Sequence, residues 1–160
     1  MKFRPIIFSL AISLFGLSAC DNQRVFEQNI DIEKGKWAKD DIKHFEFEIV
    51  EPQQSYNIYY NIRNTVSFPF HNLFLTYTLE DDKGNELSSK LQNMNIFDEK
   101  TGEPLGNGLG DIFDIQVLSI ENYSFDRPGK YVFKVQQFMR RDTLPDILSI
   151  GIRVERFSNE

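Results

Sequence analysis

Alternation of apolar and polar residues with a period of two is the feature that most constrains the fold of this chain. In segment 44–49, the apolar residues Phe45, Phe47 and Ile49 are separated by glutamates. Side chains of a strand point alternately to its two faces, so this segment is predicted to be a strand with one buried face and one face toward water. The same alternation recurs at 56–63, 73–79, 131–137 and 147–155.

Turn residues separate these segments. Asp81–Asn85 reads as a hairpin turn after which 86–91 returns antiparallel, and Pro128-Gly129 centres another turn. Short strands joined by connections of varied length predict an all-β chain, an antiparallel two-sheet β-sandwich. The pattern leaves immunoglobulin-like and jelly-roll connectivity equally open. The alternation fails between Asn93 and Gly110, where we expect weaker structure.

The segment before the first alternation has the order of a lipoprotein signal peptide. Lys2 and Arg4 precede an apolar stretch that ends in Leu17-Ser18-Ala19-Cys20, and this stretch is too short to span a bilayer comfortably. Leu17 would not suit the small-residue site of an ordinary signal peptidase. We therefore expect cleavage between Ala19 and Cys20, with acyl chains on Cys20. Several chains are needed, because one chain anchors a protein only marginally.

These features divide the chain into three expected parts: a signal peptide at 1–19, the lipidated cysteine with a short tether at 20–24, and a single β-sandwich domain at 25–160. We also expect 27–41 to be extended, with Trp37 anchored on the sandwich. Only four residues separate Cys20 from Val25. The domain is therefore expected to stay close to the membrane.

Charge and cysteine content exclude several classes of function. Removing Lys2 and Arg4 with the leader leaves 16 basic residues against 24 acidic ones, a formal charge of −8. An acidic chain disfavours nucleic acid and anionic lipid headgroups, so we expect attachment through the acyl chains and no nucleic-acid partner. Cys20 is the only cysteine. Once it is acylated, disulfides, thiolate zinc sites and cysteine nucleophiles are excluded.

Residues suited to catalysis are sparse. The sequence has no G-x-S-x-G elbow, and its two histidines, His44 and His71, have no recognisable partner order. No carboxylate has a setting that would raise its pKa, although a hydrolase with paired carboxylates is a weaker alternative. We expect no enzymatic activity, no metal site and no cofactor.

The acidic, glycine-rich loop region is a candidate for binding rather than catalysis. The G-x-G-x-G run at 106–110 lacks the Lys-Ser or Lys-Thr and the following helix of a phosphate loop. Asp111 and Asp114 follow it, and they are candidate partner-binding residues. Together with Asp98 and Glu99 they leave a calcium site open as an alternative to a solvated loop.

Three aromatic residues fall on the faces opposite the main apolar sets. Tyr59, Phe74 and Phe138 are therefore candidate partner-binding residues, suited to packing on a protein or to stacking on sugar rings. The alternative is that loops cover them, as is ordinary for some outward rings. A row of such rings with flanking carboxylates would favour sugar, whereas an exposed strand edge would favour protein.

Several motifs resemble the gliding motility lipoprotein GldH family of the Bacteroidetes. The motifs are Arg24-Val25-Phe26-Glu27, Trp37 with Asp40-Asp41, Phe45-Glu46-Phe47, 56–59, 61–64, 68–70, 72–75, 106–111, Phe113-Asp114, 128–131, 136–141 and 150–155. They extend over nearly all of the chain beyond the leader.

The resemblance implies a lipoprotein of the cell envelope that supports gliding and the associated type IX secretion machinery. On this basis we expect a non-enzymatic binding or scaffolding component, held in the outer membrane by lipid on Cys20, with other gliding or secretion proteins as partners. The alternative is a glycan-binding surface lipoprotein. The resemblance supplies no catalytic residue.

Overall fold

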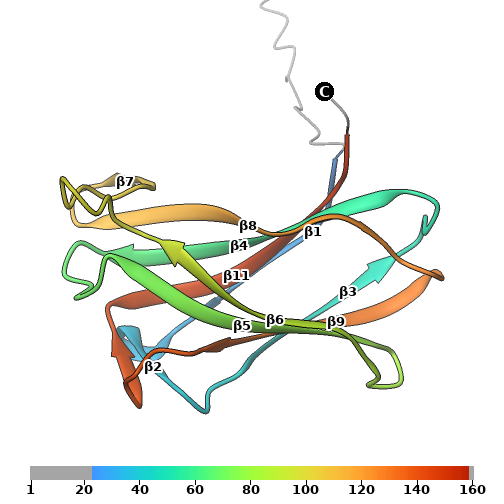
Figure 1. Cartoon of the computed structure of the whole chain (residues 1–160), viewed down its shortest axis with the longest axis horizontal. Helices are drawn as coiled ribbons and strands as arrows, with labels where there is room; N and C mark the ends of the chain where they lie inside the picture. Colours follow the sequence, from blue (N-terminus) through green and yellow to red (C-terminus); the bar gives the residue numbers. More distant parts are fainter. Residues whose placement is uncertain (1–22, 159–160) are drawn as a thin grey trace, which may run out of the picture.

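The computed structural model describes residues 23–158, and within them nearly all regular structure is β-strand (Figure 1). The elements in chain order are β1 (Arg24–Asp31), the 3-10 helix η1 (Glu33–Gly35), β2 (Lys36–Ala38), β3 (Lys43–Ile49), β4 (Ser55–Thr65), β5 (Asn72–Asp81), β6 (Glu86–Asn95), β7 (Asn107–Leu109), β8 (Ile112–Ser124), β9 (Gly129–Gln137), β10 (Thr143–Pro145) and β11 (Ile147–Arg156). The first strand begins one residue before the expected domain boundary.

Two antiparallel sheets lie face to face with the core between them (Figure 1). One sheet has the order β1-β11-β4-β8-β7 and the other β3-β9-β5-β6, while β2 and β10 form a separate two-stranded ribbon. The prediction of an antiparallel two-sheet sandwich is therefore confirmed.

The connectivity is that of a jelly roll. The eight long strands pair as β1 with β11, β3 with β9, β4 with β8 and β5 with β6, so each strand pairs with its counterpart counted from the other end of the chain. Successive pairs lie in alternate sheets, which wraps one long folded ribbon into a double layer. This pairing decides between the two connectivities that the sequence left open.

Alternation sets the core, as the sequence predicts. In β5, Leu73, Leu75, Tyr77 and Leu79 are buried, and the residues between them are half-buried on the outer face. The last strand, β11, departs from the rule: Ser149 to Ile152 are buried in succession, so that both of its faces are covered there. Apolar residues on β3, β4, β9 and β11 complete the same core.

Aromatic rings fill the middle of the core. Phe133 is fully buried, with its ring 5.2 Å from that of Tyr77 and 6.1 Å from that of Tyr60. Burial raises the pKa of Tyr60, so its hydroxyl remains a donor and bonds Gln92 Oε1 at 2.8 Å. The Gln92 amide in turn donates to the carbonyl of Ser119 at 2.7 Å, which links β6 to β8 across the open side of the sandwich.

The segment before β3 is anchored by Trp37, as expected. Its side chain has no exposed surface, and its Nε1 donates to the Asp41 carbonyl at 2.7 Å. The interval 93–110 is more ordered than the sequence suggests. β6 continues to Asn95, the N–H groups of Ile96 and Phe97 both donate to the His71 carbonyl, and both side chains are buried in the core.

The two ends of the described chain lie together. The Gln23 side chain donates to Ser158 Oγ at 3.1 Å, and the Arg156 N–H donates to the Gln23 carbonyl at 2.8 Å. The start of β1 and the end of β11 thus define one end of the sandwich, and β2 lies toward the opposite end (Figure 1).

Candidate functional site

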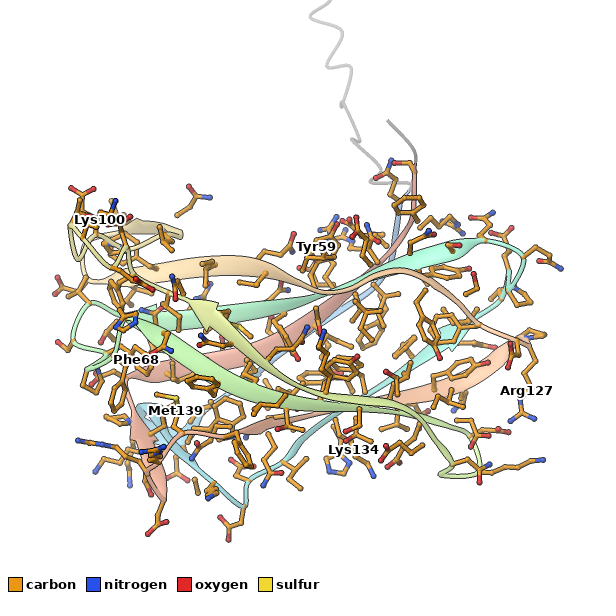
Figure 2. The ribbon with its side chains drawn as sticks, in the orientation of Figure 1. Tyr59, Phe68, Lys100, Arg127, Lys134 and Met139 are labelled. Atoms are coloured by element: carbon orange, nitrogen blue, oxygen red, sulfur yellow. The ribbon has the colours of Figure 1, made fainter. Side chains whose placement is uncertain are left out.

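An apolar cleft opens at the end of the sandwich far from Gln23 (Figure 2, near Met139). It has a volume of about 480 Å³, within the range typical of ligand pockets. We call it the end cleft; its lining residues are Phe70, Phe74, Leu91, Phe138, Met139, Arg140 and Arg141. Phe74 and Phe138, two of the three rings predicted to face outward, therefore meet in one site.

The residues after β9 are held by a buried amide. Gln137 has no exposed surface; its Oε1 accepts from the Met139 N–H at 2.9 Å, and its Nε2 donates to the Arg141 carbonyl at 3.0 Å. The Phe138 N–H donates to the Phe74 carbonyl at 2.8 Å. These bonds fix the wall of the end cleft and leave 52% of Phe138 exposed.

Cations surround the cleft. Lys39 Nζ lies 5.7 Å from the centre of the Phe138 ring, and the Arg141 guanidinium lies 5.4 Å from that of Phe70, both within cation–π range. Arg140 pairs with no carboxylate among residues 23–158. A positive rim on an acidic chain favours an occupant that carries an apolar group beside a carboxylate.

Tyr59, the third predicted ring, lies elsewhere. It is half-buried on the outer face of the five-stranded sheet, on the opposite side of the sandwich from Phe74 (Figure 2). Its hydroxyl accepts a hydrogen bond from Asn57 Nδ2 at 3.2 Å. The three rings therefore form no single row. A row of these rings, the arrangement that would have favoured sugar binding, is absent.

The predicted acidic residues are also separated by the fold. Asp111 is exposed in the turn between β7 and β8, whereas Asp114 lies on β8 and accepts two bonds from Arg63, at 2.7 and 3.1 Å. Asp98 accepts from the N–H groups of Lys100 and Thr101, which lower the pKa of its carboxyl. Within residues 23–158, no group of three or more His, Cys, Asp or Glu side chains is placed to hold a metal ion.

Sequence reasoning missed the other half of the end cleft. Arg140 and Arg141 occur in a connection between strands, where charged residues are common and carry no period. Leu91 and Met139 come from segments far apart in the chain. One sequence feature could have pointed to these residues. The segment Gln136–Arg141 is one of the motifs of the family resemblance, and the structure places it at the wall of the end cleft.

The strand pairing places the chain in the class of antiparallel jelly-roll sandwiches, and its leader has the features of a lipoprotein signal. The chain belongs to the GldH lipoprotein family, whose model matches residues 24–154. Membership supports a membrane-anchored lipoprotein of the cell envelope. In the part that the structure describes, no helix is long and apolar enough to cross a membrane.

Two relatives match along almost their whole length. The gliding motility lipoprotein GldH homolog of Christiangramia forsetii is 32% identical, and the match covers 98% of each chain. The gliding motility lipoprotein GldH of Flavobacterium johnsoniae is 28% identical, again over 98% of each chain. Among solved structures, the infectious bursal disease virus VP2 subviral particle aligns with a TM-score of 0.37 and 11% identity over 81% of this chain and 30% of that chain, a weak likeness.

Proposed function

We propose that this lipoprotein is a non-enzymatic component of the gliding machinery that binds another envelope protein in its end cleft. The observation that carries the proposal is the cleft itself, an apolar site with aromatic walls and a rim of cations. The names of the two relatives support the role in gliding. The link to type IX secretion is part of the same proposal.

The start of β1 and the end cleft lie at opposite ends of the domain. In the proposal, cleavage after Ala19 leaves Cys20 lipidated, and β1 starts at Arg24, so the end of the sandwich at Gln23 faces the outer membrane. β1 has eight residues and spans about 24 Å at the usual rise per residue. The end cleft therefore faces away from the lipid, where an envelope partner reaches it.

The partner proposed is a protein segment with an apolar or aromatic side chain next to Asp or Glu. Its ring or aliphatic group would fill the cleft between Phe74 and Phe138, and its carboxylate would pair with Arg140 or Arg141. Leu91 belongs to β6, the outermost strand of its sheet. An extended partner segment would therefore also find a strand edge beside the cleft.

Carboxyl groups support a binding role over catalysis. The pKa values of the Glu27, Asp81 and Asp98 carboxyls are all lowered. Partial burial opposes the shift at Glu27, but hydrogen bonds from Arg24 and Asn61 lower its pKa overall. A general acid at neutral pH needs a raised pKa.

Chromosomal alleles that make the apolar, positively charged cleft polar and negatively charged test the proposal. Cells producing the protein with Phe138→Asp and Arg140→Glu are expected to spread on agar no further than a deletion strain. Both side chains are exposed, so the amount of lipoprotein in the membrane fraction should be unchanged. Lys83→Glu, on an exposed turn at the other end, is the matched charge control and should spread normally.

Normal spreading by the Phe138→Asp, Arg140→Glu cells would refute the cleft as the functional site. Normal spreading by the deletion strain would refute the role in gliding.

A further inference from the structure

The outer face of the five-stranded sheet carries a second concave site, on the opposite side of the sandwich from the end cleft. Its volume is about 390 Å³. We call it the polar groove, and its lining residues are Glu27, Asn29, Asp31, Asn61, Ile62, Arg63, Asn107, Asp114, Ile115, Gln116 and Ser149. Amide, carboxylate and guanidinium groups dominate this lining, in contrast to the rings of the end cleft.

The register of the strands brings amide side chains into one row. Asn29 pairs with Gly151, Gly151 with Asn61, and Asn61 with Gln116, across β1, β11, β4 and β8. Gly151 leaves the middle of this row without a side chain. A Cβ there would lie 1.9 Å from Asn29 Oδ1 and 2.5 Å from the Gln28 carbonyl, so only glycine permits this close approach.

Part of the lining is fixed by internal hydrogen bonds. Gln116 Nε2 donates to Asn61 Oδ1 at 2.9 Å, and Asn61 Nδ2 donates to Glu27 Oε1 at 2.9 Å. In the neighbouring row, Arg63 holds Asp114 by two hydrogen bonds. These groups are therefore oriented before any ligand arrives, which lowers the entropic cost of binding.

The rest of the lining is free to bind. Among residues 23–158, the exposed side chains of Asn29, Asp31 and Asn107 form no hydrogen bond with one another or with a neighbour. The two amides both donate and accept, and the carboxylate accepts. The groove thus offers both hydrogen-bond donors and hydrogen-bond acceptors around Gly151, which has no side chain.

We propose that the polar groove binds a neutral glycan. Sugar hydroxyls donate and accept in alternation, as the free groups require. An anion is disfavoured because Arg63 is held by Asp114 and the Asp31 side chain lies close to Arg63. Tyr59 lies on the same face, one row from Asn61, and its ring supplies an apolar surface for a sugar ring (Figure 2). An apolar protein segment fits the end cleft instead.

Binding of defined sugars to the full-length lipoprotein in lipid nanodiscs tests this inference. The probes are cellohexaose, maltohexaose, mannohexaose and chitohexaose, titrated by calorimetry. We expect at least one to bind, and Asn29→Ala, Asp31→Ala and Tyr59→Ala each to weaken that binding about tenfold or more. Lys83→Ala, an exposed change outside the groove, should leave binding unchanged.

Failure of all four sugars to bind would overturn the inference. Binding that survives both Asn29→Ala and Asp31→Ala would also overturn it, because the sugar would then sit elsewhere. Thermal unfolding of each variant separates loss of binding from loss of fold. Neither result bears on the end cleft, which lies on the other sheet.

Discussion

Replacing Phe133 with alanine should lower the free energy of unfolding by about 3–5 kcal/mol, the range for removing a fully buried phenylalanine. Phe133 has no exposed surface and packs against Tyr77 and Tyr60 at the centre of the double layer. The neighbouring rings belong to paired strands and cannot collapse freely into the cavity. For a domain of this size, the loss corresponds to a fall in Tm of roughly 6–20 °C.

Phe138→Ala is the matched control, because it removes the same ring five residues further along the chain. Phe138 is 52% exposed, so its loss should cost no more than about 1 kcal/mol. Urea unfolding followed by circular dichroism measures both variants. Equal losses for the two variants would contradict the assignment of Phe133 to the core and Phe138 to the surface.

Replacing Cys20 with serine should abolish membrane retention. On the proposed lipidation of Cys20, loss of the thiol prevents formation of the diacylglyceryl thioether, and each acyl methylene that leaves the bilayer forfeits about 0.8 kcal/mol. Cys20 lies outside the described residues, and the β-structure begins at Arg24, so Tm of the domain should be unchanged. The variant is expected to lose incorporation of an alkyne-labelled palmitate.

Carbonate washing of membranes provides the measurement, with Lys83→Ala as a control that should remain in the pellet. A Cys20→Ser protein that stays in the pellet after washing would show that something other than acyl chains holds it. Release of the control protein as well would show that the anchor is weak in every form.

The strands could be predicted from sequence because burial alternates with the same period as the side chains. Phe45 and Leu75 lie in strands of this kind, and each is fully buried. The strand partners could not be predicted, since alternation states which side chains face inward and not which strand lies alongside. The pairing of β1 with β11 joins the two ends of the described chain, and no local pattern signals it.

The candidate site was predictable to the same extent. The outward direction of Phe74 and Phe138 follows from alternation, but their meeting depends on the pairing of β5 with β9. The polar groove could not be predicted from the sequence for a similar reason. Asn29, Asn61 and Gln116 are unremarkable polar positions in three separate strands, and only the register brings them into one row.

Photo-crosslinking in living cells tests the central claim, that the protein acts by binding a partner in its end cleft. A photoreactive phenylalanine at position 138 should give one discrete adduct, and the crosslinked peptide should contain an acidic residue next to an apolar one. Arg140→Glu with Arg141→Glu should abolish that adduct, and the same probe at position 83 should not form it. An adduct that persists after both charge reversals, or none at position 138, would contradict the account.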